Sequence, residues 1–134
     1  GIGYFSLGIA KKAKKVYAVE KNPVAFRYLK ENIKLNKIKN IVAINTDCRK
    51  FIPSEGIDRI IMGYFPETEK FLNHALNIIG KGMIHYHNSA KIRTEIENQI
   101  KSACKERKFK IQEIRKVKSI APRTYHFVAD VKIQ

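Results

Sequence analysis

Short apolar runs alternate along the chain with segments in which apolar residues recur at helical spacing. The runs at 16–19, 41–45, 57–62 and 82–87 are typical of buried parallel strands. The helical spacing predicts helices over 5–12, 23–36, 66–79 and 91–107. Asn22-Pro23 supplies an N-cap followed by a proline in the first turn, and Gly80 and Gly82 mark a helix end. This alternation indicates an α/β fold.

The last third of the sequence has a strand pattern of period two. Residues 109–118 and 124–133 are predicted to be extended, with a turn at 121–123, so they form a hairpin. Strand–helix units closed by a terminal hairpin are the layout of the class I methyltransferase fold, a Rossmann-like, mostly parallel sheet with helices on both faces and a last strand inserted antiparallel.

The sequence begins at a glycine-rich loop, which in this fold follows a strand. We therefore expect the first strand to lie outside the given sequence. Residues 1–134 are predicted to be one cofactor-binding domain, truncated at its amino end.

The charge balance is strongly basic. The chain has 27 Lys and Arg against 12 Asp and Glu, a net charge of +15. Such a field attracts polyanions, which indicates a nucleic acid partner. A lysine-rich surface can also reflect adaptation to high temperature, but glutamate usually rises in parallel and does not do so here. The basic runs 11–15 and 115–118 are either solvated faces or part of an RNA-binding track.

Several classes of protein are excluded by the composition. No stretch approaches the ~20 apolar residues of a transmembrane helix, and the first residues do not have the pattern of a signal peptide. The two cysteines are too few and too far apart for a disulfide framework or a zinc site. We expect a cytoplasmic, soluble protein, a monomer without a metal.

Gly1 and Gly3 form a loop in which the missing side chains let the backbone approach a ligand. Glu20 lies 17 residues after Gly3, at the end of a predicted strand, where its carboxylate can accept two hydrogen bonds from a ribose diol. The third glycine of the dinucleotide-binding motif is replaced by Ser6, which argues against a cofactor with a pyrophosphate. S-adenosylmethionine fits this pattern. The alternative for Glu20 is a solvated acid at a strand end.

Asp47 and Cys48 follow the next predicted strand. Asp47 is placed to accept a hydrogen bond from the adenine amino group, and Cys48 would contribute its backbone. The alternative for Asp47 is a local turn or cap before Arg49.

Tyr64 and Phe65 stand after the strand at 57–62, where many amino-directed methyltransferases have an Asn/Asp-Pro-Pro-aromatic motif. Here Gly63 replaces the Asn or Asp, which argues against attack by an exocyclic amine. The two aromatic side chains are predicted to stack on an unpaired or flipped base. The alternative is that they face the core.

His85 and His87 are two residues apart on the strand at 82–87 and point the same way. A metal pair lacks a nearby third ligand. We expect hydrogen bonds within the fold, with a second role in contacting substrate phosphate.

The same motifs resemble a known family along the whole length of the chain. They are the loop at 1–6, the segment 16–23, Asp47-Cys48-Arg49, Gly63-Tyr64, residues 84–87 and the tail 118–122 with His126. The sequence is similar to the archaeal tRNA wybutosine-synthesising aminocarboxypropyltransferases, relatives of the tRNA guanine-N1 methyltransferases. Gly63-Tyr64, in place of an Asn-containing motif, favours the aminocarboxypropyltransferases.

The resemblance implies transfer of the 3-amino-3-carboxypropyl group of S-adenosylmethionine to carbon 7 of a tricyclic guanine derivative in tRNA for phenylalanine. By the same resemblance, Glu20 is the ribose ligand, Asp47 and Cys48 contact adenine, and Gly1 and Gly3 form the cofactor loop. No residue can be assigned as general base. The alternatives are a tRNA guanine-N1 methyltransferase and, in another class, a non-catalytic RNA-binding module.

Overall fold

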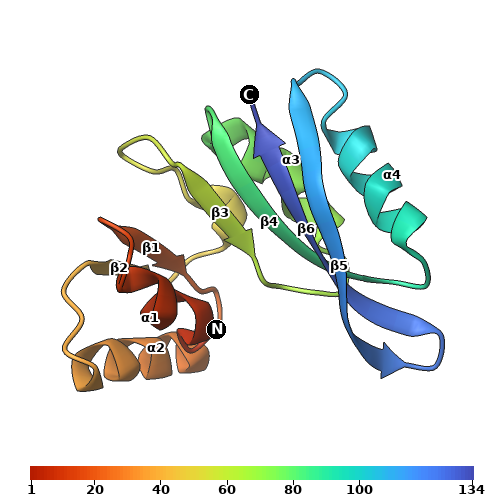
Figure 1. Cartoon of the computed structure of the whole chain (residues 1–134). Helices are drawn as coiled ribbons and strands as arrows, with labels where there is room; N and C mark the ends of the chain where they lie inside the picture. The colour runs from red at the N-terminus through yellow and green to blue at the C-terminus, as the bar shows by residue number, and fades with distance from the viewer. The chain divides into compact units, whose positions relative to one another are not determined.

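In the computed structural model, which describes residues 1–134, the helices and strands fall into two units, Gly1–Phe51 and Ile52–Gln134 (Figure 1). The amino-terminal unit contains α1 (Tyr4–Ala10), β1 (Val16–Val19), α2 (Pro23–Leu35), β2 (Ile41–Ile44) and the short 3₁₀ helix η1 (Cys48–Lys50). The carboxy-terminal unit contains β3 (Arg59–Met62), α3 (Glu69–Ile78), β4 (Gly82–Ala90), α4 (Arg93–Ala103), β5 (Phe109–Ala121) and β6 (Thr124–Ile133).

In the amino-terminal unit, β1 and β2 pair in parallel from Val16↔Ile41 to Val19↔Ile44. The predicted start of α2 is confirmed. The Asn22 side chain accepts hydrogen bonds from the backbone N–H groups of Val24 and Ala25, and Pro23 is the first helical residue.

The carboxy-terminal unit has a four-stranded sheet in the order β3-β4-β6-β5. β3 and β4 are parallel, whereas β6 lies between β4 and β5 and is antiparallel to both. This confirms the predicted terminal hairpin and the antiparallel insertion of the last strand.

The helices α3 and α4 cover one face of this sheet (Figure 1). The alternating apolar positions predicted in the last strand face these helices, and Phe127, Ala129, Val131 and Ile133 are buried. On β4, Tyr86 and Asn88 lie on the same face, and Asn88 Nδ2 donates to the Tyr86 hydroxyl at 2.9 Å. The opposite face of the sheet carries the histidines described below.

Arg107 and Gly82 shape the connection between α3 and β4. The Arg107 guanidinium donates to the carbonyls of Leu76, Ile79 and Gly80, and so satisfies groups that the end of a helix leaves unpaired. Gly82 was predicted to mark the helix end, and its position explains the glycine further. A Cβ there would lie 2.1 Å from the Asp58 carbonyl oxygen, so no other residue fits without movement.

Several details differ from the sequence prediction. α4 spans Arg93–Ala103 in place of 91–107, and β5 continues past 118 to Ala121, where it pairs with Thr124. The strands form two separate hydrogen-bonded sheets, β1-β2 and β3-β4-β6-β5, in place of the single predicted sheet, because no backbone pairing joins β1 or β2 to β3. β4 continues three residues past 87, because its pairing with β6 extends to Ala90↔Tyr125. α3 begins at Glu69, because the Thr68 hydroxyl donates to the Tyr64 carbonyl and holds the preceding residues in a turn. The single domain predicted for residues 1–134 stays a prediction.

Candidate functional site

The glycine loop is held against α2. Gly3 has a φ of 103°, and a Cβ at this position would lie 3.0 Å from Leu29 Cδ1 and 3.3 Å from Leu7 Cγ. Both the backbone conformation and the packing therefore favour glycine. The Ile2 carbonyl accepts a hydrogen bond from Asn32 Nδ2 on α2 at 3.0 Å. This fixes the loop to the helix.

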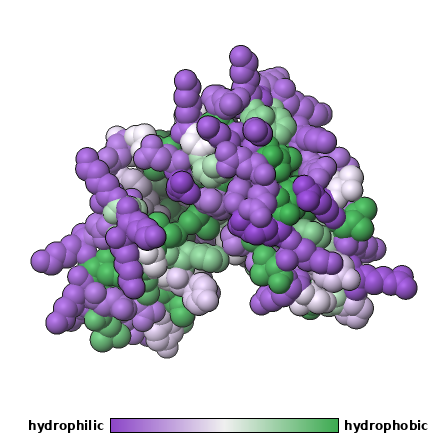
Figure 2. All heavy atoms as spheres, viewed as in Figure 1, coloured by the Kyte–Doolittle hydropathy of each residue, from purple (hydrophilic) through white to green (hydrophobic).

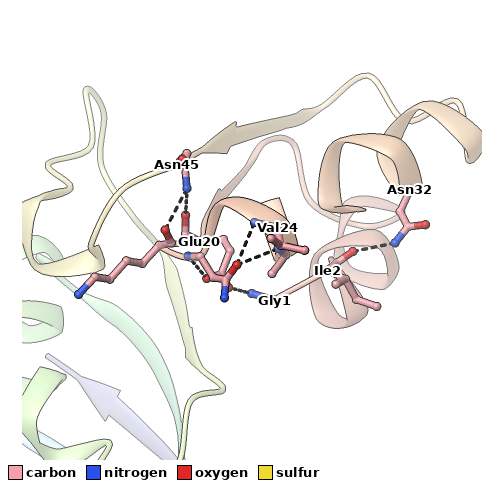
Figure 3. A network of polar contacts seen from close by, with 9 residues as sticks. Gly1, Ile2, Glu20, Val24, Asn32 and Asn45 are labelled. Carbon is pink, nitrogen blue, oxygen red and sulfur yellow. Dashed lines mark hydrogen bonds and ion pairs between the residues drawn. The ribbon is translucent and has the colours of Figure 1, made fainter. Parts of the chain in front are cut away.

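Glu20 and the glycine loop lie together, as the sequence predicts (Figure 3). The Glu20 backbone N–H donates to the Ile44 carbonyl, so the residue directly extends β1. One carboxylate oxygen contacts the amino group of Gly1, and the other accepts from the Asn22 N–H at 2.6 Å. Asn45 Nδ2 donates to the Glu20 carbonyl at 2.8 Å. These contacts hold a carboxylate, with 17% of its side chain exposed, beside the loop.

Asp47 is engaged by its neighbours. It caps η1 by accepting from the Arg49 N–H at 3.0 Å, and its two oxygens accept from Arg49 Nε and Nη2 at 3.0 and 2.6 Å. The Lys21 ammonium lies 3.7 Å away. The hydrogen bonds from Arg49, with the charge of Lys21 a smaller cause, hold the pKa of the Asp47 carboxyl well below its usual range. The local cap considered as the alternative for Asp47 is therefore present, and the carboxylate is a permanent acceptor.

Cys48 is the first residue of η1 and is exposed. Partial burial raises the pKa of its thiol, so the thiol is less nucleophilic than an ordinary cysteine. This favours a backbone role over thiol chemistry.

Glu20 and Asp47 follow the carboxyl ends of two adjacent parallel strands, the edge at which α/β sheets bind ligands. Both offer only hydrogen-bond acceptors when ionised. A ligand that presents hydroxyl or amino donors matches this pair, and the glycine loop beside Glu20 admits a close approach of that ligand.

In the carboxy-terminal unit, Tyr64 and Phe65 follow β3 but have different surroundings. The Tyr64 side chain is 64% exposed and meets Phe71 edge to face at 5.6 Å. Phe65 stacks on the His126 imidazole, with ring centres 4.4 Å apart and an angle of 21° between the planes. Tyr64 is thus presented to solvent, while Phe65 is packed against the sheet.

His85 lies between a carboxylate on β6 and a guanidinium on β3. Its Nδ1 is 2.7 Å from Asp130 Oδ1, and its Nε2 is 3.2 Å from Arg59 Nη1. Because a guanidinium can only donate, Nε2 accepts and Nδ1 carries the proton that is donated to Asp130. The predicted hydrogen bonding of His85 within the fold is confirmed.

His87 also bonds within the fold, through a partner that the sequence does not reveal. Its Nδ1 lies 3.1 Å from His126 Nε2 on β6, and both rings are buried. Burial, with the neighbouring His126 a smaller cause, lowers the pKa of His87 to about 4. His126 Nδ1 is buried and has no hydrogen-bond partner. Phe65, His126 and His87 therefore form a continuous cluster on the sheet face opposite the helices.

Sequence reasoning missed Asp130, and it did not show that His126, which belongs to the motifs of the resemblance, is the partner of His87. Both residues lie on the last strand of the chain. The β4–β6 register brings them beside the histidines, since it pairs His85 with Asp130 and Ser89 with His126. Two further findings concern the chain as a whole. No group of three or more His, Cys, Asp or Glu side chains could hold a metal ion. None of the helices is long and apolar enough to cross a membrane.

The fold and the two strand-end acids define a Rossmann-like α/β domain of the class I methyltransferase type. The model of the TRM5/TYW2 methyltransferase domain matches residues 1–112. The chain belongs to this family.

Individual relatives agree with this family. The chain is 42% identical, over its whole length, to the tRNA(Phe) (4-demethylwyosine(37)-C(7)) aminocarboxypropyltransferase of Methanocaldococcus jannaschii, of which it covers 57%. It is 40% identical over 99% of its length to the tRNA (guanine(37)-N(1))-methyltransferase Trm5b of the same organism, of which it covers 38%. The crystal structure of M. jannaschii TYW2 in complex with AdoMet matches the whole chain with a TM-score of 0.91 at 42% identity, and the match covers 65% of that structure.

Proposed function

We propose that the chain is the catalytic part of a tRNA aminocarboxypropyltransferase. The reaction transfers the 3-amino-3-carboxypropyl group of S-adenosylmethionine to carbon 7 of 4-demethylwyosine, 3′ of the anticodon in tRNA for phenylalanine. Methylthioadenosine is released, in the synthesis of wyosine derivatives. The proposal is supported by the similarity to the M. jannaschii aminocarboxypropyltransferase and to TYW2 in complex with AdoMet. A tRNA substrate implies action in the cytoplasm, and we expect a monomer.

The amino-terminal unit would hold the cofactor. Glu20 would accept hydrogen bonds from the two ribose hydroxyls, exchanging its present bond from the Asn22 N–H for bonds to the ligand. Asp47 is held ionised by Arg49, and would accept from the adenine amino group beside the Cys48 backbone. Gly1, where a Cβ would meet no atom within 4 Å, would leave room for the methionine part of the cofactor, and Gly3 would hold the loop in its conformation against Leu29.

The loop after β3 carries the choice between the two reactions of the family. All three carbons bonded to the sulfonium are activated, so the carbon held in line with the nucleophile is the one transferred. A methyltransferase that acts on nitrogen needs a side chain that accepts from that nitrogen, and Gly63 supplies none. This substitution is the observation within the sequence that favours carboxypropyl transfer over methyl transfer.

The same loop would receive the base. Tyr64 is largely exposed, so its side chain would be available to stack on an unpaired base. Phe65 would hold the loop against the sheet by stacking on the His126 ring. His85 and His87 would lie on the face of the sheet opposite the helices, the face on which Phe65 packs. We assign none of these residues as general base.

The experiment is to incubate the protein with S-adenosylmethionine and tRNA that contains the tricyclic base, and to measure the mass of the modified nucleoside. We expect a mass gain equal to one 3-amino-3-carboxypropyl group. A gain of one methyl group on unmodified tRNA would instead assign the chain to the guanine-N1 methyltransferases.

A further inference from the structure

The outer half of β5 and the turn that follows it form a basic, exposed segment. We define the basic hairpin as residues 115–123, in which every residue is exposed. It contains four cations, Arg115, Lys116, Lys118 and Arg123, and the sequence has no acidic residue between 114 and 129. β5 is also the edge strand of its sheet.

The four cations differ in how far the chain itself neutralises them. Arg115 lies 2.6 Å from Glu113 Oε2 and 3.1 Å from Asp130 Oδ2, so its charge is paired. The Lys116 ammonium sits 4.3 Å from the centre of the Tyr125 ring. The side chains of Lys118 and Arg123 form no ion pair and no hydrogen bond within the chain. These two charges are available to a partner.

The strand register places these charges at a particular end of the sheet. The last β4–β6 pair is Ala90↔Tyr125, and the hairpin closes at Ala121↔Thr124, beyond the carboxyl end of β4. In open α/β sheets, ligands bind outside the carboxyl ends of the parallel strands. The unpaired charges therefore lie at the edge of the sheet where a substrate is expected.

A second pair of cations lies at the opposite end of the same hairpin, one on β5 and one on β6. Lys110 and Lys132 are exposed and directly opposite each other in the register. Like charges in this arrangement repel. This pair has the same number of charges as Lys118 and Arg123 and lies on the two strands of the same hairpin, whereas Lys118 is on β5 and Arg123 is in the turn. It therefore provides a control for the effect of position.

We propose that the basic hairpin docks on the phosphate backbone of the RNA substrate through Lys118 and Arg123. The inference rests on the proposed function, because it takes RNA as the substrate. Figure 2 shows that long hydrophilic side chains project from much of the visible face, so net charge alone attracts RNA from many sides. Position at the carboxyl edge, exposure and the missing internal counter-ions distinguish the basic hairpin from the other lysines. Charges on an edge strand also prevent pairing with a second sheet, and this competing role is tested below.

The test compares the double variants K118A/R123A and K110A/K132A with the wild type. Binding to tRNA is measured by fluorescence anisotropy over a series of salt concentrations, and the molecular mass by light scattering. Each phosphate contact contributes a slope of roughly 0.7 to 0.9 to log K against log salt. We expect K118A/R123A to lower the slope by about 1.4 to 1.8 and to weaken binding at moderate salt by at least about tenfold. K110A/K132A removes the same net charge and is expected to keep the wild-type slope.

Equal losses in the two variants would overturn the proposal, because net charge would then explain binding. Failure of the wild type to bind tRNA at low salt would also overturn it. A doubled mass of K118A/R123A with unchanged RNA binding would assign the charges to edge protection.

The outcomes separate this inference from the proposed function. Group transfer by the wild type, together with unchanged binding by K118A/R123A, removes only the inference. Selective loss of binding, together with an inactive wild type, removes only the proposed function.

Discussion

The substitution Gly3→Ala tests how the glycine loop is built. At a φ of 103°, an alanine is strained by about 1 to 2 kcal/mol. The new Cβ would also lie 3.0 Å from Leu29 Cδ1 and 3.3 Å from Leu7 Cγ, so both side chains must move by a few tenths of an ångström. Leu29 is almost completely buried, and overpacking of this kind adds about 1 to 2 kcal/mol. We expect a total destabilisation of about 2 to 4 kcal/mol.

The control is Gly8→Ala in α1, the helix that follows Gly3. Gly8 is exposed, and a Cβ there would meet no atom within 4 Å. Alanine is the better helix former, so this variant should gain about 0.5 to 1 kcal/mol. Urea denaturation followed by circular dichroism, with hydrogen exchange of the α1 amides, measures both variants. A Gly3→Ala protein that unfolds at or above the urea midpoint of Gly8→Ala would refute the strained-loop account.

Two further predictions concern single acidic and basic side chains. Glu20→Ala should weaken S-adenosylmethionine binding by about 1.5 to 3 kcal/mol, the range for a lost charge-assisted hydrogen bond, as measured by isothermal titration calorimetry. If the dissociation constant and the melting curve are both unchanged, Glu20 is only a solvated acid at a strand end. The pKa of His87 is lowered from 6.5 to about 4, so between these pH values only the unfolded chain takes up the proton, and stability falls as the pH is lowered. After allowance for solvent screening, we expect a loss of about 1 to 2 kcal/mol across this range that is absent in His87→Gln. An equal loss in both proteins would contradict this assignment.

The fold could be predicted because its signals are local. The Asn22-Pro23 pair fixes the start of α2, and the period-two pattern of the last strand fixes which of its side chains face the helices. The boundary of β4 was less predictable. Asn88 and Ser89 are polar residues with a low preference for strands. Their pairing with Phe127 and His126 on β6 nevertheless keeps them in the sheet.

The site was predictable only where its residues are close in sequence or share a strand end. Glu20 was placed beside the glycine loop from spacing, and the structure brings them together. Local pattern cannot show that Asp130 orients His85, or that His126 joins His87 to Phe65, because these contacts depend on the register between strands far apart in the chain. For Asp47, the sequence left a local cap as an alternative, and the bonds to Arg49 show that the cap exists.

The most direct test of the central claim is a transfer assay with cofactor labelled either in the methyl group or in the carboxypropyl group. The protein is incubated with each form, and with unmodified tRNA or tRNA that contains the tricyclic base. Because Gly63 offers no side-chain acceptor for a nitrogen nucleophile, we expect label to enter the RNA only from the carboxypropyl group, with release of methylthioadenosine. Methyl label in the RNA, with release of S-adenosylhomocysteine, would contradict the proposed function.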